Sequence, residues 1–209
     1  MQDSERVGAA LQRDFPNVAA SKDRAWSRVP ALRVIDCVLS LNRNYDRFVV
    51  PRLDAFENRF PDTTTVKHLR DLMDTFDSPA TFVHDALNYR DAPRAQVLSS
   101  VIDYLLGMMA ATEGDSELEK LAHWARASRP EEYRRLGIRG FALAGFQYLR
   151  MLFGANTTKP DVHIRRYVGV AIGHRVSDVE ALSLLEEAAT RYGLTLRDVD
   201  TTIWEASAR

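Results

Sequence analysis

The side chain with the clearest chemical potential is the carboxylate of Asp161. It follows Lys159 and Pro160 in a short connector and stands at the start of an expected helix, Val162 to Ala171. The dipole of such a helix favours an ionised carboxylate at its N-terminus. That group can stabilise a developing positive charge, or orient and deprotonate a water molecule. The alternative is structural, because an Asp after a proline is an ordinary helix cap.

A glycine-rich turn lies upstream of this connector. Residues Leu136 to Gly140 read Leu-Gly-Ile-Arg-Gly, and an apolar helical run, Phe146 to Phe153, follows and closes at Gly154. Gly137 and Gly140 allow positive φ and close approach of another backbone. The free N–H groups of a helix N-terminus favour an anion. The turn and its helix therefore indicate a clamp for a phosphate group.

The turn, the helix and the Asp together resemble the helix-hairpin-helix and Gly/Pro…Asp signature of the endonuclease III-like (HhH-GPD) DNA glycosylase superfamily. The spacing of turn, helix and Asp follows the family. One departure is the turn itself, which reads Gly-Ile-Arg-Gly where the family has Gly-x-Gly, so the register shifts by about one residue. The matching residues are Leu136, Gly137, Gly140, Ala144, Gly154, Asp161, His163, Ile164 and Arg166.

In that family the glycine turn binds the DNA backbone, and the Asp takes part in cleaving the base from its sugar. The resemblance therefore implies a catalytic Asp161. His163 matches a family position that packs or bonds near the hairpin. Contacts to the DNA backbone are implied for Gly137, Arg139, Gly140 and Arg166.

Two other segments resemble parts of the family that enter the DNA. The stretch Leu39 to Asn44 is similar to a Leu-Ser-x-Gln segment, which gives Asn42 a role beside the target nucleotide; alternatively, Asn42 caps or ends a helix. The loop Leu87 to Ala95 is similar to one that pushes a wedge into the base stack. Leu87, Asn88 and Tyr89 are the wedge candidates, and a solvated loop with a snorkelling tyrosine is the alternative.

The absence of one lysine shapes the expected mechanism. Bifunctional relatives carry a nucleophilic lysine in the second hairpin helix, where this chain has Ala142 or Leu143. The resemblance thus implies a monofunctional glycosylase that uses water and has no lyase activity. Lys159 is expected to be solvated or to face a phosphate. Phe141, Tyr148 and Trp204 are candidates for stacking on a flipped base, although aromatic residues at such spacing are more often core.

Helical patterns surround these residues. Leu32, Ile35, Val38 and Leu39 repeat at helical spacing after Pro30, and similar stripes recur with a period near 3.6. No convincing period-two strand is present, so we predict an all-α fold of about ten helices. The segment from Met1 to Val29 is polar and weakly periodic, which predicts an arm or a short helix. Capping-box spacing marks helix starts at Ser116 with Glu119, Ser128 with Glu131, and Ser177 with Glu180.

The resemblance also implies how the helices divide. A central helical lobe is expected over residues 31–156, ending in the helix-hairpin-helix of residues 136–153. Residues 1–30 and 157–209 are expected to form a second lobe. The active site would then lie in the cleft between two lobes, with Asp161 at the hinge.

Composition limits cofactors and partners. The chain has 28 basic and 29 acidic residues, so no global positive field favours nucleic acid. Cys37 is the only cysteine, which excludes an intrachain disulfide and an iron–sulfur cluster held by four cysteines. The five histidines show no paired ligand spacing, so no metal site and no cofactor are expected, apart from a monovalent cation at the hairpin.

Location and partners follow from the same residues. No apolar run reaches membrane-spanning length, and no signal-peptide core is present at the N-terminus. We therefore expect a monomer in the cytoplasm, associated with the nucleoid and without membrane contact. Its expected partner is double-stranded DNA that carries a modified base.

Three functions remain open from the sequence. The first is a DNA glycosylase of base excision repair that uses Asp161 to hydrolyse the N-glycosidic bond of a flipped base. The second is a helix-hairpin-helix protein that binds DNA but has lost its chemistry. The third is a helical interaction module without DNA affinity, which predicts no salt-dependent binding to duplex.

Overall fold

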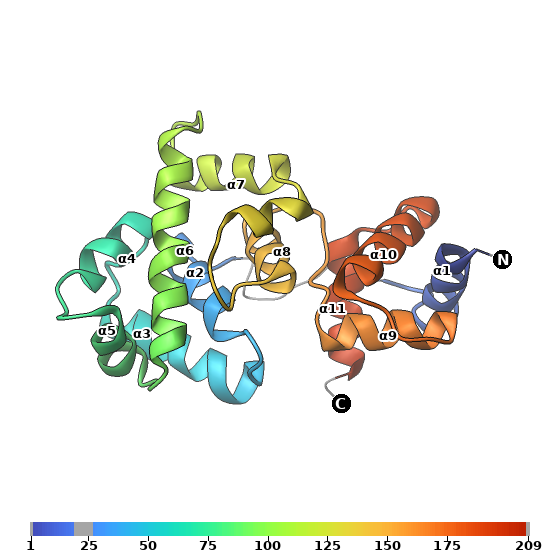
Figure 1. The fold of residues 1–209 in the computed structure, drawn as a ribbon, viewed down its shortest axis with the longest axis horizontal. Coiled ribbons are helices and arrows are strands. Elements are labelled where there is room, and N and C mark those ends of the chain that lie inside the picture. Colours follow the sequence, from blue (N-terminus) through green and yellow to red (C-terminus); the bar gives the residue numbers. More distant parts are fainter. Residues whose placement is uncertain (1, 19–26, 208–209) are drawn as a thin grey trace.

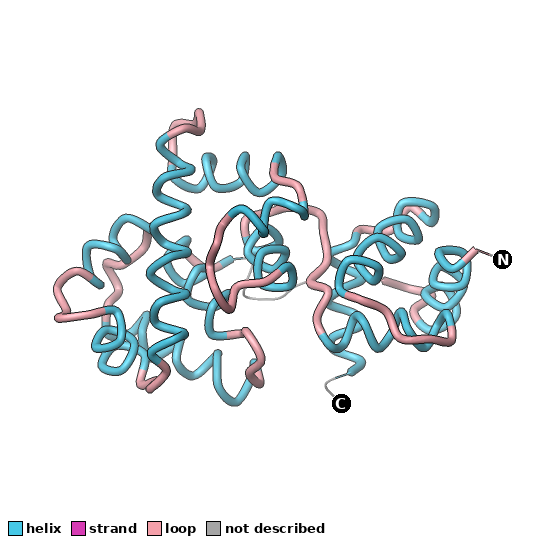
Figure 2. The backbone as a smooth tube through the Cα atoms, in the orientation of Figure 1, coloured by secondary structure: helices cyan, strands magenta, loops and turns pink. Residues whose placement is uncertain are grey.

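The predicted all-α fold is confirmed. The computed structural model describes residues 2–18 and 27–207, and every regular element within these ranges is a helix (Figures 1 and 2). The α-helices are α1 (Asp3–Asp14), α2 (Pro30–Leu39), α3 (Val50–Arg59), α4 (Val66–Met73), α5 (Pro79–Leu87), α6 (Ala92–Ala110), α7 (Glu117–Ala127), α8 (Leu143–Leu152), α9 (Val162–Ile172), α10 (Asp178–Tyr192) and α11 (Leu196–Ser207). A π-helix, η2 (Tyr45–Val49), and a 3₁₀-helix, η3 (Pro130–Arg135), complete the set.

Local capping explains most of the helix boundaries. Ser116 and Ser177 begin α7 and α10, each in a capping box with the glutamate three residues later, as predicted. The predicted box at Ser128 is wrong. Ser128 is the residue that ends α7, and the glutamate that caps the next helix is Glu132, whose Oε1 accepts from the Arg129 backbone N–H at 3.0 Å at the start of η3. Pro130 at the first position of η3 fixes this shift, because its φ suits a helix start.

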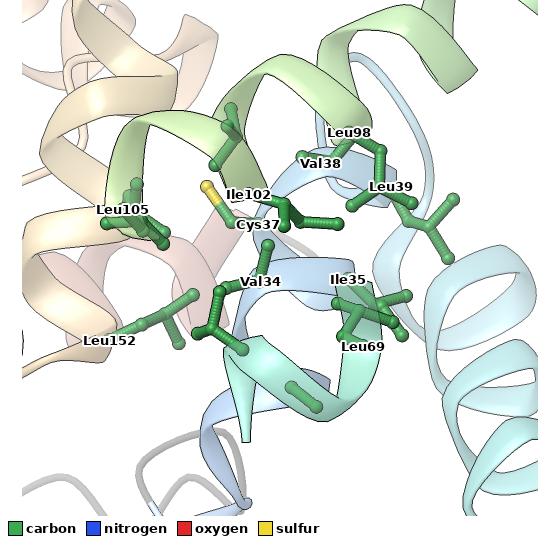
Figure 3. Close-up of a cluster of buried hydrophobic side chains, with 14 of the residues drawn as sticks. Val34, Ile35, Cys37, Val38, Leu39, Leu69, Leu98, Ile102, Leu105 and Leu152 are labelled. Carbon is green, nitrogen blue, oxygen red and sulfur yellow. The ribbon is translucent and has the colours of Figure 1, made fainter. Parts of the chain in front are cut away.

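One hydrophobic core is organised around α2. Eight residues of this ten-residue helix are buried, which is typical of a helix enclosed on all sides. Its neighbours in the core come from η2, α3 to α8 and the turn before α8. In Figure 3, Val34, Ile35, Cys37 and Val38 of α2 lie among Leu69, Leu98, Ile102, Leu105 and Leu152. Each fully buried side chain of this size stabilises the fold by about 1.5–3 kcal/mol.

A second hydrophobic core joins the first helix to the last three. Val7 and Leu11 of α1 are fully buried with residues of α9, α10 and α11. Gly8 lets α1 approach α10 closely, since a Cβ atom at this position would lie 1.8 Å from the ring of Tyr192 in α10. Figure 1 shows α1 in blue beside the orange and red helices, although it comes from the other end of the sequence. The segment after α8 therefore leads from one core to the other.

Candidate functional site

A cleft of about 530 Å³ collects residues from both groups of helices. Its lining comes from the end of α2 and the turn into η2, the glycine turn with one face of α8, the connector and first turn of α9, Asp178 at the start of α10, and α11. Of the site residues predicted from the sequence, the cleft brings together Asn42, Gly140, Tyr148, Asp161 and Trp204. The others lie elsewhere, as described below.

Asp161 both caps a helix and lines the cleft. Its Oδ1 accepts hydrogen bonds from the backbone N–H of His163 at 2.8 Å and of Ile164 at 3.3 Å. These are the free donors of the first turn of α9, so the cap explains why the helix begins here. Its other oxygen, Oδ2, lies 4.0 Å from Lys159 Nζ. The carboxylate is thus held by one oxygen while the other faces the cleft.

Lys159 lies inside the cleft, which contradicts the solvated alternative predicted from the sequence and leaves the phosphate-facing one a prediction. Its side chain is only 17% exposed. The ammonium lies 4.5 Å from the centroid of the Tyr148 ring, in addition to its contact with Asp161. An anion and an aromatic face are the usual partners of a cation. Lys159 therefore forms part of the cleft wall.

A buried carboxyl, Asp36, anchors the floor of the cleft. It is fully buried in α2, and burial raises the pKa of this carboxyl. Four side chains donate hydrogen bonds to it: Tyr45 Oη at 2.8 Å, Ser40 Oγ at 3.0 Å, Tyr148 Oη at 3.0 Å and Arg28 Nη1 at 3.3 Å. Because Ser40, Tyr45 and Tyr148 also line the cleft, Asp36 fixes their positions from below.

A second carboxyl, Asp200, fastens α11 to the connector. Its Oδ1 accepts hydrogen bonds from Thr158 Oγ1 at 2.5 Å and from the Lys159 backbone N–H at 2.8 Å. Burial, supported by the nearby charge of Asp161, raises the pKa of Asp200 to about 7. Asp200 also lines the cleft. Sequence reasoning missed both Asp36 and Asp200, although a lone carboxyl inside an apolar helical stripe was a usable signal for Asp36.

The three aromatic candidates separate in the structure. Trp204 is half-buried at the cleft, where its ring meets that of Tyr45 edge to face at 5.9 Å. Tyr148 lines the cleft, with its hydroxyl on Asp36. Phe141 is 3% exposed and belongs to the first core, where it packs against Gly145. Phe141 is therefore a core residue, and a base in the cleft would not reach it.

The glycine turn adopts the predicted backbone. Gly137 and Gly140 have φ of 63° and 87°, and both are exposed with Arg139 between them. Nothing lies within 4 Å of the position of a Cβ atom at Gly137, which leaves open space for another molecule. Gly140 borders the cleft, whereas Gly137 and Arg139 lie outside its lining. Before the turn the chain forms a 3₁₀-helix, η3, and after it α8 begins without a side-chain cap.

The predicted wedge loop lies beside the cleft. Leu87 is 2% exposed and packs in the first core, so its side chain is not available as a wedge. Asn88 is exposed with φ of 47°, and it ends α5. The Tyr89 hydroxyl donates to Asp91 at 2.6 Å and accepts from Arg43 at 2.8 Å. Because Arg43 lines the cleft, it connects this loop to the site.

Asn42 and Arg166 lie on opposite sides of Asp161 in the sequence and differ in their surroundings. Asn42 is exposed in the turn after α2 with φ of 59°, so it lies beyond the helix end and lines the cleft. Arg166 lines a separate, shallower hollow on α9 with Val170 and His174. That hollow shares Val162 and Arg165 with the cleft, so the two are neighbours on the surface.

Comparisons with known proteins identify one family. The model described as "Domain of unknown function (DUF8548)" matches residues 6–208. No curated protein and no solved structure matches the chain. Within the described residues, no cluster of three or more His, Cys, Asp or Glu side chains is arranged to hold a metal ion. None of the described helices combines the length and apolar character that crossing a membrane requires.

Proposed function

We propose that this chain, which belongs to the DUF8548 family, is a monofunctional DNA glycosylase similar to the HhH-GPD superfamily. The observation that carries the proposal is the cleft, because Asp161, Gly140 of the glycine turn, Asn42 and Trp204 all line this one cavity. These residues come from four separate parts of the sequence. A local role as a helix cap accounts for Asp161 alone and leaves the convergence of the other three unexplained.

The two hydrophobic cores support a division into two lobes. We assign residues 31–156 to a central lobe, since its core draws on α2 to α8. We assign residues 1–30 and 157–209 to the second lobe, since the described part of these ranges contributes α1 and α9 to α11 to one core. Asp161 then belongs to the connector that joins the lobes. This arrangement gives a catalytic carboxylate access to a substrate held by both.

The glycine turn supports a helix-hairpin-helix with a shortened first helix. In this interpretation η3, the turn at Gly137 to Gly140, and α8 form the hairpin, and the exposed turn contacts the phosphate backbone. Two glycines with positive φ let the DNA backbone approach the N–H groups of the turn. Arg139 and Arg166 contribute charge on either side. The partner is double-stranded DNA, bound by a monomer in the cytoplasm near the nucleoid.

The mechanism uses Oδ2 of Asp161, the oxygen that does not cap α9 and lies 4.0 Å from Lys159 Nζ. As the bond between sugar and base breaks, positive charge develops on the sugar, and a carboxylate within a few ångströms stabilises it. The same carboxylate orients a water molecule, which attacks the sugar carbon and gives up a proton. Lys159 is paired with Asp161 and the Tyr148 ring, and positions 142 and 143 carry no amine. A Schiff base is therefore not expected, and the strand stays intact.

The test is a cleavage assay with duplex oligonucleotides that each carry one modified base. We expect breaks that appear only after alkali treatment on one substrate class, and a loss of at least about 100-fold in rate for Asp161→Asn. Asparagine caps a helix as well as aspartate, so this variant should keep its stability. Asp161→Ser is the second cap-preserving variant, and Asp46→Asn, on the exposed η2, is the control that should retain activity.

Three results would contradict the proposal. Undiminished cleavage by Asp161→Asn would exclude Asp161 as the catalytic carboxylate. Salt-sensitive duplex binding by both proteins without breaks on any substrate would favour a DNA-binding protein without chemistry. Absence of any salt-dependent binding would favour a helical interaction module.

A further inference from the structure

One wall of the cleft is formed by a single face of α11. Asp200, Thr201 and Trp204 all line the cleft, and Asp200 and Trp204 are four residues apart. Residues at this spacing are neighbours on a helix surface. An aromatic ring and a carboxyl group therefore lie next to each other on the cleft wall. A planar heterocycle that stacks on Trp204 would present its edge to Asp200.

The hydrogen bonds of Asp200 leave one of its oxygens available. Within the described residues, two groups donate hydrogen bonds to this carboxyl, Thr158 Oγ1 and the Lys159 backbone N–H. Oδ1 accepts both. Asp200 keeps part of its surface exposed, and it lines the cleft. Oδ2 is therefore the oxygen that a ligand in the cleft would meet. Burial, together with the nearby charge of Asp161, raises the pKa of Asp200 to about 7, so a substantial fraction of this carboxyl is protonated at neutral pH and most of it below.

We propose that Asp200 and Trp204 form the subsite for the excised base, and that Asp200 is a further catalytic residue that donates its proton to a ring nitrogen of that base. This inference rests on the glycosylase function proposed above and names its substrate class: an uncharged base with a nitrogen acceptor at its edge. Trp204 stacks on the ring of the base, and Asp200 forms a hydrogen bond to a nitrogen at the edge of the base and protonates it.

The proton balance of the step is simple. The carboxyl O–H of Asp200 breaks as its proton moves to the base nitrogen, and the electron pair of the bond between sugar and base leaves with the base. Water adds to the sugar carbon and loses its proton to Asp161. Asp200 then takes up a proton from solvent, and Asp161 releases to solvent the proton that it received from the water. No oxidant, reductant or metal is required.

The proposal separates two kinds of damaged base. An alkylated base that already carries a positive charge leaves without protonation, whereas an uncharged base needs an acid to leave at a useful rate. Asp200 should therefore matter for uncharged bases and should matter little for cationic ones. A residue that only supports the fold would affect both classes equally.

The first experiment measures binding of free bases through the fluorescence of Trp204. Adenine, hypoxanthine, cytosine and uracil are titrated into the wild type at pH 5.5 and pH 8.5, and Trp204→Phe identifies the signal that belongs to this ring. We expect at least one base to bind about fivefold or more tightly at pH 5.5, because the protonated carboxyl donates a hydrogen bond. Asp200→Asn should bind with less than about twofold dependence on pH, because its amide donates at both pH values.

Other charged or titratable groups line the same cleft, so the pH dependence of the wild type alone does not identify the responsible group. These groups are Arg43, Tyr45, Tyr148, Lys159, Asp161, His163, Arg165 and Asp178. The comparison with Asp200→Asn does identify the responsible group. Asp198→Asn provides the matched control, since Asp198 belongs to the same helix and lies outside the cleft lining. It should keep the pH dependence of the wild type. The same dependence in Asp200→Asn, or no binding of any base, would overturn the subsite.

The second experiment uses cleavage and separates this inference from the proposed function. Asp200→Asn should lose about 100-fold or more in rate on an uncharged base and less than about tenfold on a cationic alkylated base. Equal losses on both would overturn the role as acid. Base binding that depends on Asp200 without cleavage of any duplex would leave the subsite standing and overturn the glycosylase. Cleavage that depends on Asp161 but not on Asp200 would support the glycosylase and overturn the subsite.

Discussion

The floor and the α11 wall of the cleft each contain a buried aspartate, and the two differ in how their oxygens are used. Asp36 in the floor receives four side-chain hydrogen bonds, one of them from the guanidinium of Arg28. Asp200 in the wall receives two, both on one oxygen. A fully bonded carboxyl holds its neighbours in place. One with a free oxygen can act on a ligand, so the comparison separates a positioning role from a chemical one.

Removal of the floor carboxyl should have the largest effect. Asp36→Ala removes the carboxylate that accepts from the Tyr45 and Tyr148 hydroxyls, and with it the nearer of the two ion-pair partners of Arg28, whose other partner, Asp54, lies at 3.7 Å. We expect the free energy of unfolding to fall by about 3–5 kcal/mol, the cost of breaking a buried ion pair by deleting one partner. Urea unfolding monitored by circular dichroism measures it. A loss below about 1 kcal/mol would show that the floor does not depend on this group.

Replacing Asp200, the carboxyl of the wall, should raise the free energy of unfolding where replacing Asp36 lowers it. This gain should increase with pH. The pKa of Asp200 is raised from 3.8 to about 7 in the folded protein. Between these values the folded state holds a proton that the unfolded state has released, so the free energy of unfolding falls as pH rises. Asp200→Asn removes this dependence. We expect the variant to gain about 3 kcal/mol over the wild type between pH 4.5 and pH 8.

The measurement is urea unfolding of both proteins at several pH values between these limits. Asparagine can still accept from Thr158 and Lys159 through Oδ1, so the clamp between α11 and the connector remains. Asp198→Asn should reproduce the wild-type slope. A constant difference between Asp200→Asn and the wild type across this range would show that Asp200 is ionised throughout.

The smallest effect should come from the two tyrosines of the floor. Tyr45→Phe and Tyr148→Phe each remove one hydrogen bond to Asp36 and leave three. Each should reduce the free energy of unfolding by about 0.5–1.5 kcal/mol. Because both phenols share the acceptor, the double variant should differ from the sum of the single ones. Strict additivity in the double-mutant cycle would indicate that the two bonds are independent.

The sequence was informative where structure is local. The helical stripes predicted the all-α fold, and Ser116 and Ser177 marked true helix starts because a capping box involves only four consecutive residues. The N-terminal stretch, predicted as an arm or short helix, contains α1. Asp161 stood out because a turn, a helix and a proline precede it. The structure bears out its position at the head of α9, and its chemistry stays a prediction.

The remainder of the site depends on contacts between distant segments. Asp36 meets Tyr148 across 112 residues, and Asp200 meets Thr158 across 42, so no local pattern reports either pair. Phe141 and Trp204 looked alike as aromatic residues at helical spacing. Only packing reveals that Phe141 fills the first core while Trp204 borders the cleft. Burial is a property of the assembled helices, and single residue types do not report it.

The docking of α1 against the last helices has a consequence for biosynthesis. On the ribosome α1 is made well before its partners, because the residues that pack on Val7 and Leu11 lie in α9, α10 and α11. The core around α2 draws only on residues 31–155 and can form while synthesis continues. The wall that carries Asp200 and Trp204 is made after this core. The cleft is therefore complete only once α11 has been synthesised, when α1 docks on helices made much later than itself.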